Sequence, residues 1–160
     1  MDDMQGSVTV HMAAPAERIW DLVADVRNTG KFSPETFEAE WLDGAEGPAV
    51  GVRFRGHVRR NGIGPVYWTT CRITECVPNR AFGFAVLAGD RVVNNWHYAL
   101  QPSTEGTDVT ESFQLPESLP TRVYYWVFGG FLRQRNNIRD MRRTLERIRE
   151  VAENTATDTF

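Results

Sequence analysis

The chain contains only two cysteines and three histidines in 160 residues, which leaves little material for disulfides or metal sites. Cys71 and Cys76 fall in one predicted strand, five positions apart. Residues i and i+5 of a regular strand point to opposite faces of a sheet, so a disulfide between them is sterically implausible. The histidines, at positions 11, 57 and 97, show no metal-ligand spacing. We therefore expect neither a metal site nor a cofactor.

Long apolar segments are also missing. No apolar run approaches the ~20 residues that a membrane-spanning helix needs. The first residues contain no basic region followed by an apolar core, so no signal peptide is recognisable. We therefore expect a protein without a membrane span, and a cytoplasmic location follows by default.

Neither sign of charge dominates, but the charges are unevenly distributed. The net charge is −3, although residues 1–50 carry ten acidic and three basic residues and residues 129–150 carry seven arginines against three acidic residues. A nucleic-acid surface is not expected, because the overall balance is not basic and no recognisable module is present. The arginines of 129–150 form either a solvated helix face or a surface for a regulatory partner.

The sequence does contain a long series of segments in which apolar residues alternate with polar ones. This period-two pattern is typical of half-buried strands. Turn residues separate the segments, and Asn61-Gly62 is a strong hairpin signal. Short connections between such segments indicate an antiparallel meander. The predicted strands are 7–12, 36–41, 50–58, 67–77, 81–87, 91–100 and 107–115.

Two segments have helical periodicity instead. The first starts at Pro15, with Glu17 near the positive end of the helix dipole, and a short helical turn follows. The second extends from about 118 to 153, and its apolar residues lie on one helix face. These residues are Phe131, Ile138, Met141, Leu145, Ile148 and Ala152. Gly129-Gly130 predicts either a kink in this helix or a break after which the long helix begins.

The elements follow one another without a linker, a repeat or a low-complexity segment, which indicates one domain. We expect the domain to comprise residues 1–153 and the polar residues 154–160 to be a frayed tail. The order is strand, helix, short helical turn, six strands and long helix, which is an α+β fold. The long helix has to bury its apolar face against the sheet, and that arrangement can enclose a cavity.

Short motifs in a characteristic order are distributed over the whole chain. They are VHMAAPAERIW (10–20), VADV (23–26), FSPE (32–35), EWLDG (40–44), GVRFRG (51–56), TTCRITE (69–75), WHY (96–98), GTDVTES (106–112) and MRRTL (141–145). With them the chain resembles the START/Bet v 1-like superfamily (SRPBCC), and more closely its bacterial polyketide cyclase/dehydrase and lipid transport group. The resemblance implies a helix-grip fold, in which a curved seven-stranded antiparallel sheet wraps around the C-terminal helix and short helices lie between strands 1 and 2. It also implies a hydrophobic tunnel, but it names no ligand.

Strand alternation places one set of side chains on the face that the long helix covers. The set is rich in aromatic residues and includes polar atoms that a sealed apolar core would not tolerate without partners. Such a set forms either the wall of a small-molecule site or a filled core. The predicted lining residues are Phe54, Tyr67, Thr69, Cys71, Phe84, Trp96, Tyr98, Glu111, Phe113, Tyr124, Phe128, Phe131, Gln134 and Ile138.

Glu111 and Tyr98 are the candidate catalytic residues of this set. A buried Glu111 would have a raised pKa unless it is paired, and it could anchor a ligand hydroxyl or act as a general acid or base. Alternatively Tyr98 or an arginine holds it, or it lies in water near the strand end. The Tyr98 phenol donates either to a ligand carbonyl or to a backbone carbonyl. Cys71 is interpreted as a buried structural thiol.

Three functions remain open. The favoured one is binding, for transport or sequestration, of a hydrophobic small molecule such as a lipid, polyketide or isoprenoid. The alternatives are a polyketide aromatase/cyclase that uses the polar groups of the same cavity, and a regulatory protein that acts through its arginine-rich helix. No acid–base pair, nucleophile or metal motif is recognisable, so catalysis stays undecided, as does the choice between monomer and homodimer.

Overall fold

The computed structural model describes residues 5–59, 66–116 and 130–155, with the backbone alone described for 130–137 and for 155. Every predicted strand is present within a few residues of its predicted bounds, whereas the predicted Asn61-Gly62 turn lies outside the described residues. The elements in chain order are β1 (Gln5–Met12), α1 (Ala16–Ala24), η2 (Val26–Lys31), β2 (Thr36–Trp41), β3 (Arg53–Val58), β4 (Tyr67–Val77), β5 (Ala81–Ala88), β6 (Arg91–Ser103), β7 (Gly106–Gln114) and α3 (Gly130–Thr155).

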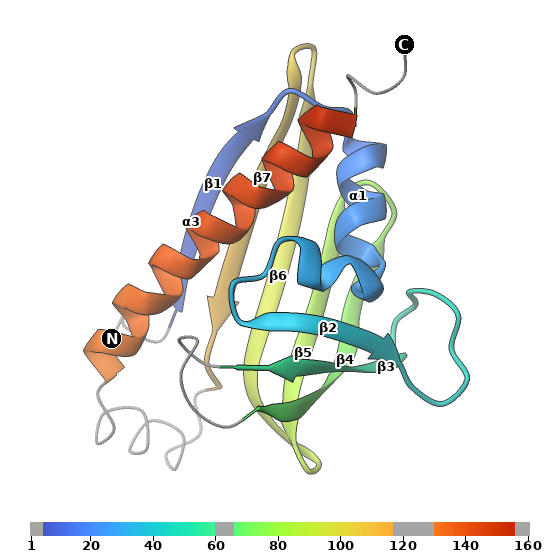
Figure 1. Ribbon diagram of the computed structural model, residues 1–160, viewed down its shortest axis with the longest axis vertical. Coiled ribbons are helices and arrows are strands. Elements are labelled where there is room, and N and C mark those ends of the chain that lie inside the picture. The colour runs from blue at the N-terminus through green and yellow to red at the C-terminus, as the bar shows by residue number, and fades with distance from the viewer. Residues whose placement is uncertain (1–4, 60–65, 117–129, 156–160) are drawn as a thin grey trace.

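The strands form one seven-stranded antiparallel sheet in the order β1-β7-β6-β5-β4-β3-β2. From β2 to β7 each strand pairs with its neighbour in the chain, as a meander requires. β1 pairs with β7 instead, so α1 and η2 carry the chain from one edge of the sheet to the other. The sheet curves around α3, which crosses it diagonally (Figure 1). The predicted α+β class and helix-grip fold are thereby confirmed.

The apolar stripe predicted for the long helix holds α3 against the sheet. Met141, Leu145, Ile148 and Ala152 are fully buried in the main core, and we call these four residues the anchor stripe. Ile138, one turn earlier, is only partly buried. Burial of this size stabilises a helix far more than the propensities of its residues do. The second half of α3 is thus a filled helix–sheet interface.

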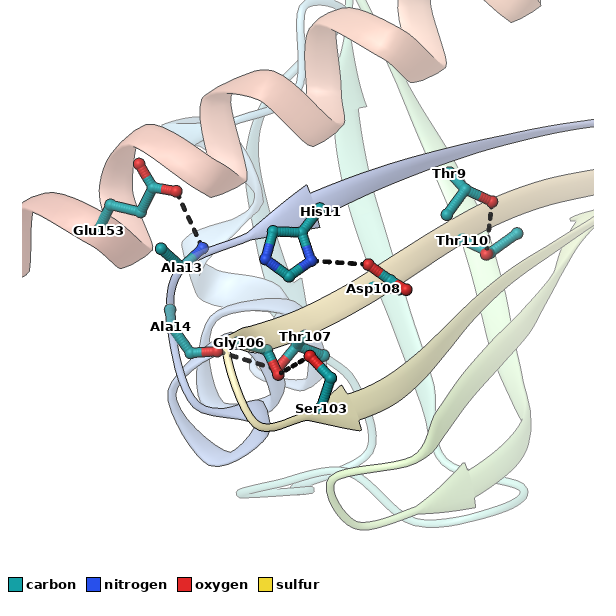
Figure 2. A network of polar contacts seen from close by, with 10 residues as sticks. All are labelled: Thr9, His11, Ala13, Ala14, Ser103, Gly106, Thr107, Asp108, Thr110 and Glu153. Atoms are coloured by element: carbon teal, nitrogen blue, oxygen red, sulfur yellow. Dashed lines mark hydrogen bonds and ion pairs between the residues drawn. The ribbon is translucent and has the colours of Figure 1, made fainter.

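The C-terminal end of α3 is fastened to the connection between β1 and α1 (Figure 2). The Glu153 side chain accepts a hydrogen bond from the Ala13 backbone N–H at 3.0 Å. Arg18 of α1 donates to the Ala152 carbonyl at 3.3 Å, so it satisfies one of the carbonyls that a helix end leaves free. These bonds link the end of α3 to the β1–α1 connection and to α1.

The start of the predicted long helix and the residues that follow α3 lie outside the described residues. At its start, Gly130 is the first described residue of α3 and Gly129 lies outside the described residues, so the choice between a kink and a break stays a prediction. At its end, α3 continues to Thr155, two residues beyond the predicted end of the domain. Residues 156–160 are not described, so the frayed tail also stays a prediction.

The side of α3 that faces away from the sheet is polar. Arg142, Arg143, Glu146 and Arg147 are exposed there. A solvated helix face has this arrangement, and it equally leaves the arginines accessible to a partner. Among the helices that the structure describes, none is long and apolar enough to cross a membrane.

A β-bulge in β4 changes the alternation that the sequence predicts. The register shifts after Ile73, so Cys71 pairs with Val86 whereas Cys76 pairs with Phe82. Because Val86 and Phe82 are four residues apart in β5, they share a face, and both cysteines lie on that face as well. The prediction that the cysteines point to opposite faces was therefore wrong. The two thiols are nevertheless free, since five strand residues separate them by about 16 Å.

Gly106, at the turn between β6 and β7, lies so close to the backbone at the end of β1 that a larger residue should not fit there. Its φ is +143°, and a Cβ at this position would lie 2.1 Å from the Met12 carbonyl oxygen. We expect Gly106→Ala to lower the free energy of unfolding by roughly 3 kcal/mol or more, because backbone strain and a clash add together. Urea denaturation measures this loss.

Gly89→Ala is the matched control for this substitution. Gly89 also has a positive φ, +64°, but no atom lies within 4 Å of its virtual Cβ. Gly89→Ala should lower the free energy of unfolding by only about 1–2 kcal/mol, which is the cost of a left-handed backbone. Equal losses in the two variants would contradict a role for the contact with Met12.

Candidate functional site

The register of the sheet brings the predicted lining residues of the strands to one face. Residues directly opposite each other in neighbouring antiparallel strands point to the same side. Three rows of such residues cross the sheet: Phe54, Cys71 and Val86; Phe84, Trp96 and Phe113; Phe82, Tyr98, Glu111 and Val8. Ile138 of α3 lies against this side of the sheet. A Cβ built on Gly6 would be 2.8 Å from Ile138 Cδ1 and 2.8 Å from Phe113 Cε1, so the two side chains meet there. We call this side of the sheet the concave face.

The predicted lining residues differ in burial. Phe54, Cys71, Tyr98, Glu111 and Phe113 are buried, and Thr69, Phe84, Trp96 and Ile138 are partly buried. Tyr67 begins β4 and is 40% exposed, so it lies at the rim of the concave face. Tyr124 and Phe128 lie outside the described residues, and Phe131 and Gln134 belong to the part of α3 described by its backbone alone. Their place in a site stays a prediction.

Aromatic rings form much of the concave face. Phe54 lies edge-on to Phe84, with ring centroids 5.3 Å apart, and the Trp96 and Phe113 centroids are 5.6 Å apart. Tilted and edge-on rings attract one another, so they hold this surface in a defined arrangement. Apolar, aromatic walls of this kind are common in small-molecule sites.

The prediction from the sequence missed Trp41. Trp41 pairs with Phe54 across β2 and β3, and their ring centroids are 6.2 Å apart. Its Nε1 is buried and has no hydrogen-bond partner among the described residues. The alternation of 36–41 contained this signal, because Ala39 and Trp41 share the apolar phase of the strand.

Tyr98 and Glu111 form a buried polar pair within this apolar face. They lie opposite each other on β6 and β7, and the Tyr98 hydroxyl donates to Glu111 Oε1 at 3.0 Å. Both residues are buried. Glu111 Oε2 is buried as well, and among the described residues it has no partner. A buried polar atom without a partner is costly and marks a place where a further group can bind.

Burial determines the protonation of this pair. It raises the pKa of Glu111 to about 8; the Tyr98 hydrogen bond opposes this rise and the negative charge of Asp140 on α3 adds to it. Burial, together with Glu111, also raises the pKa of Tyr98 well above its usual value of 10. At neutral pH both groups therefore carry their protons. A neutral carboxyl group can donate one hydrogen bond and accept others.

The described residues of the concave face offer no nucleophile beside this pair. Burial raises the pKa of the Cys71 thiol to about 12, which suppresses the reactive thiolate and fits a structural role. The histidines lie on the outer face of the sheet, where each contacts a carboxylate. These pairs are His11 with Asp108, His57 with Glu38 and His97 with Glu75. The described residues contain no group of three or more potential metal ligands.

A separate groove of about 640 Å³ opens near the C-terminal end of α3. Residues 13–17, 78–80 and 102–106 line it, and they come from the start of α1 and from two turns. None of the predicted lining residues belongs to this groove. Its described lining holds no buried polar atom without a partner, so the concave face is the stronger candidate site.

Comparisons with known proteins agree with the fold. The model of the family described as "Polyketide cyclase / dehydrase and lipid transport" matches residues 4–153. A search of curated proteins found no match.

Several solved structures are similar over nearly the whole chain. A polyketide_cyc-like protein of Corynebacterium glutamicum is 28% identical, with a TM-score of 0.67 over 98% of this chain and 95% of that one. A START superfamily protein of Mycobacterium smegmatis is 17% identical, with a TM-score of 0.73 over 94% and 98%. The di-domain ARO/CYC StfQ from the steffimycin biosynthetic pathway is 12% identical, with a TM-score of 0.72 over 96% of this chain and 52% of StfQ. The latter two show the fold alone.

The raised pKa of Glu111 makes stability depend on pH. The carboxyl group ionises near its ordinary value of 4.5 in the unfolded chain and at about 8 in the folded protein. Its stabilising effect is therefore fully present below about 4.5 and is lost as pH rises to about 8, by up to roughly 1.4 kcal/mol per pH unit. We expect Glu111→Gln, which cannot ionise, to match the parent near pH 4.5 and to be roughly 2–4 kcal/mol more stable at pH 8.5.

Urea denaturation at the two pH values measures this difference. Glu46→Gln, at an exposed position between β2 and β3, is the control, and it should follow the parent at both pH values. If the free energy of unfolding of Glu111→Gln differs from that of the parent by the same amount at both pH values, then the pKa of Glu111 is the same in the folded and the unfolded protein, and the prediction is wrong.

Proposed function

Since the chain belongs to the polyketide cyclase/dehydrase and lipid transport family, we propose that it binds a hydrophobic small molecule between the concave face and α3. The observation that carries the proposal is the Tyr98–Glu111 pair, a polar point within an aromatic wall. Apolar walls with a few convergent polar groups are typical of small-molecule sites. A purely structural core would gain from an apolar residue at position 111.

The distribution of burial supports one end of the concave face as the site. The anchor stripe fills the space under the second half of α3. Leu100 and Val109, which form the next row along the sheet from Tyr98 and Glu111, are also buried. Thr69, Phe84, Trp96 and Ile138 are only partly buried. A ligand is therefore expected near Ile138 and towards the first half of α3, where the side chains still have surface to cover.

An aromatase/cyclase is the second candidate, and the protonation of Glu111 favours it. A general acid or base is most effective when its pKa lies near the working pH, and that of Glu111 is about 8. In that case Glu111→Gln should still bind a poly-β-keto thioester but should not cyclise it. If Glu111→Gln lost both binding and turnover of the thioester, Glu111 would have a role in binding alone.

We expect a bulky side chain on the concave face to exclude the ligand. Thr69 is partly buried on this face, opposite Gly56, so Thr69→Trp would fill space that a ligand needs. The fluorescent apolar probe N-phenyl-1-naphthylamine should bind the parent and should lose roughly tenfold or more in affinity for the variant. Fluorescence titration measures both affinities.

Thr70→Trp is the matched control, because Thr70 is the next residue of β4 and points to the outer face. It should bind the probe as the parent does. Equal binding by both variants and the parent would show that the probe does not enter between sheet and helix. A parent that binds no probe and shows no copurified small molecule in native mass spectrometry would overturn the proposed function.

A further inference from the structure

One carboxyl oxygen of Glu111, Oε2, has no partner among the described residues, and this allows the class of ligand to be named more narrowly. We propose that Glu111 Oε2 donates a hydrogen bond to an uncharged oxygen of the bound molecule, such as a ketone or ester carbonyl, and that the site rejects carboxylates. Glu111 would thus be the residue that determines specificity. This inference rests on the proposed function and deepens it.

The direction of the hydrogen bond inside the pair determines where the carboxyl proton lies. The Tyr98 hydroxyl has one proton, and it donates this proton to Glu111 Oε1 at 3.0 Å. Oε1 is therefore an acceptor, and the proton of the neutral carboxyl group belongs on Oε2. Oε2 is buried and has no partner among the described residues. A ligand oxygen that accepts from it would remove the cost of an unpaired buried donor.

The charges that face Glu111 disfavour a second anion. Asp140 on α3 acts on Glu111 with a negative charge, and Tyr98 on β6 is a neutral phenol. β1 contributes apolar Val8 opposite Glu111. Arg139 lies 3.9 Å from Asp140, but its side chain is 59% exposed, so water screens it. A ligand carboxylate would add a buried negative charge without a buried cation among these neighbours, whereas a carbonyl adds none.

The neighbouring rows of the concave face indicate how the rest of the molecule lies. On the side of the anchor stripe, Leu100 and Val109 are buried and leave no surface to cover. On the other side of Glu111 lies the row that contains Phe113 and Trp96. Phe113 is buried, whereas Trp96 is only partly buried. The ligand oxygen is therefore deepest, at Glu111, and the hydrocarbon portion extends over the aromatic rings.

Two probes of equal carbon number test the discrimination: 2-undecanone, an uncharged ketone, and undecanoate, a carboxylate. Each is titrated against bound N-phenyl-1-naphthylamine at pH 6.5. We expect the ketone to displace the fluorescent probe from the parent at a concentration at least roughly tenfold lower than undecanoate does. Because a ketone is also the more hydrophobic of the two, the variants below separate the hydrogen bond from hydrophobicity.

Glu111→Leu removes the donor, so its affinity for the ketone relative to the fluorescent probe should fall roughly tenfold. Glu111→Gln keeps an N–H donor and should preserve most of this ratio. The pH profile supplies a second readout. The parent should lose ketone affinity as pH rises through about 8, when the carboxyl group ionises, whereas Glu111→Gln should not. The control Glu46→Gln, at an exposed position between β2 and β3, should show the ratio and the pH profile of the parent.

The outcomes distinguish the two proposals. An unchanged ketone ratio in Glu111→Leu, or a ketone affinity of the parent that does not change with pH, would overturn the role of Glu111 and leave ligand binding standing. Such results would mean that a water molecule, and not the ligand, satisfies Oε2. If the parent binds neither the fluorescent probe nor the ketone, the proposed function itself fails. A fall of the ratio in Glu111→Leu with its recovery in Glu111→Gln supports the inference.

Discussion

The apolar stripe of α3 has to be buried, and the curved sheet supplies the surface that buries it. Met141, Leu145, Ile148 and Ala152 are all inaccessible to solvent or nearly so. The hydrogen bonds of Glu153 and Arg18 fix the end of the helix at the same place. This contact holds α3 against β1 and β7 at one edge of the sheet, and it fixes the direction of the whole helix because a helix is rigid over a few turns. The proposed site depends on this contact, because it sets where α3 lies relative to the sheet.

Within this apolar interface the Tyr98–Glu111 pair is an energetic exception. The carboxyl group of Glu111 has one hydrogen bond and one oxygen without a partner in the described part of the chain. Burying such a group costs stability, and proteins seldom keep one in the core without a use for it. Glu111 minimises the cost by remaining protonated at neutral pH. The same proton makes it a donor, which is why stability and ligand recognition are expected to depend on one ionisation.

The outer face of the sheet carries exposed polar, charged and aromatic side chains. His57 stacks on Trp68 with ring centroids 4.2 Å apart, and the Arg55 guanidinium lies 4.3 Å from the centre of the same indole. Arg55 also pairs with Glu40 across the strands. Exposed pairs of this kind contribute little to stability individually. Their value here is that polar and charged residues on one face oppose a one-residue slip, which would move them into the core.

Local periodicity was enough to predict the strands, the anchor stripe and the face on which Phe54, Tyr98 and Glu111 lie, because each strand or helix repeats its own pattern. The bulges were not predictable in this way. The shift after Ile73 moves Cys76 to the concave face, and one near Thr36 leaves Phe37 48% exposed against His57. A bulge depends on how two strands pair, and that information is not contained in either strand alone.

The sequence by itself determined that Glu111 would point inward; it left open whether water, an arginine or Tyr98 would meet it. The tertiary structure decided for Tyr98, left one carboxyl oxygen without a partner among the described residues, and brought Asp140 of α3 close enough to act on it. The physical reason is that strand phase is a local property. Protonation and hydrogen bonding depend instead on burial and on groups distant in the chain, which only the docking of α3 onto the sheet brings together.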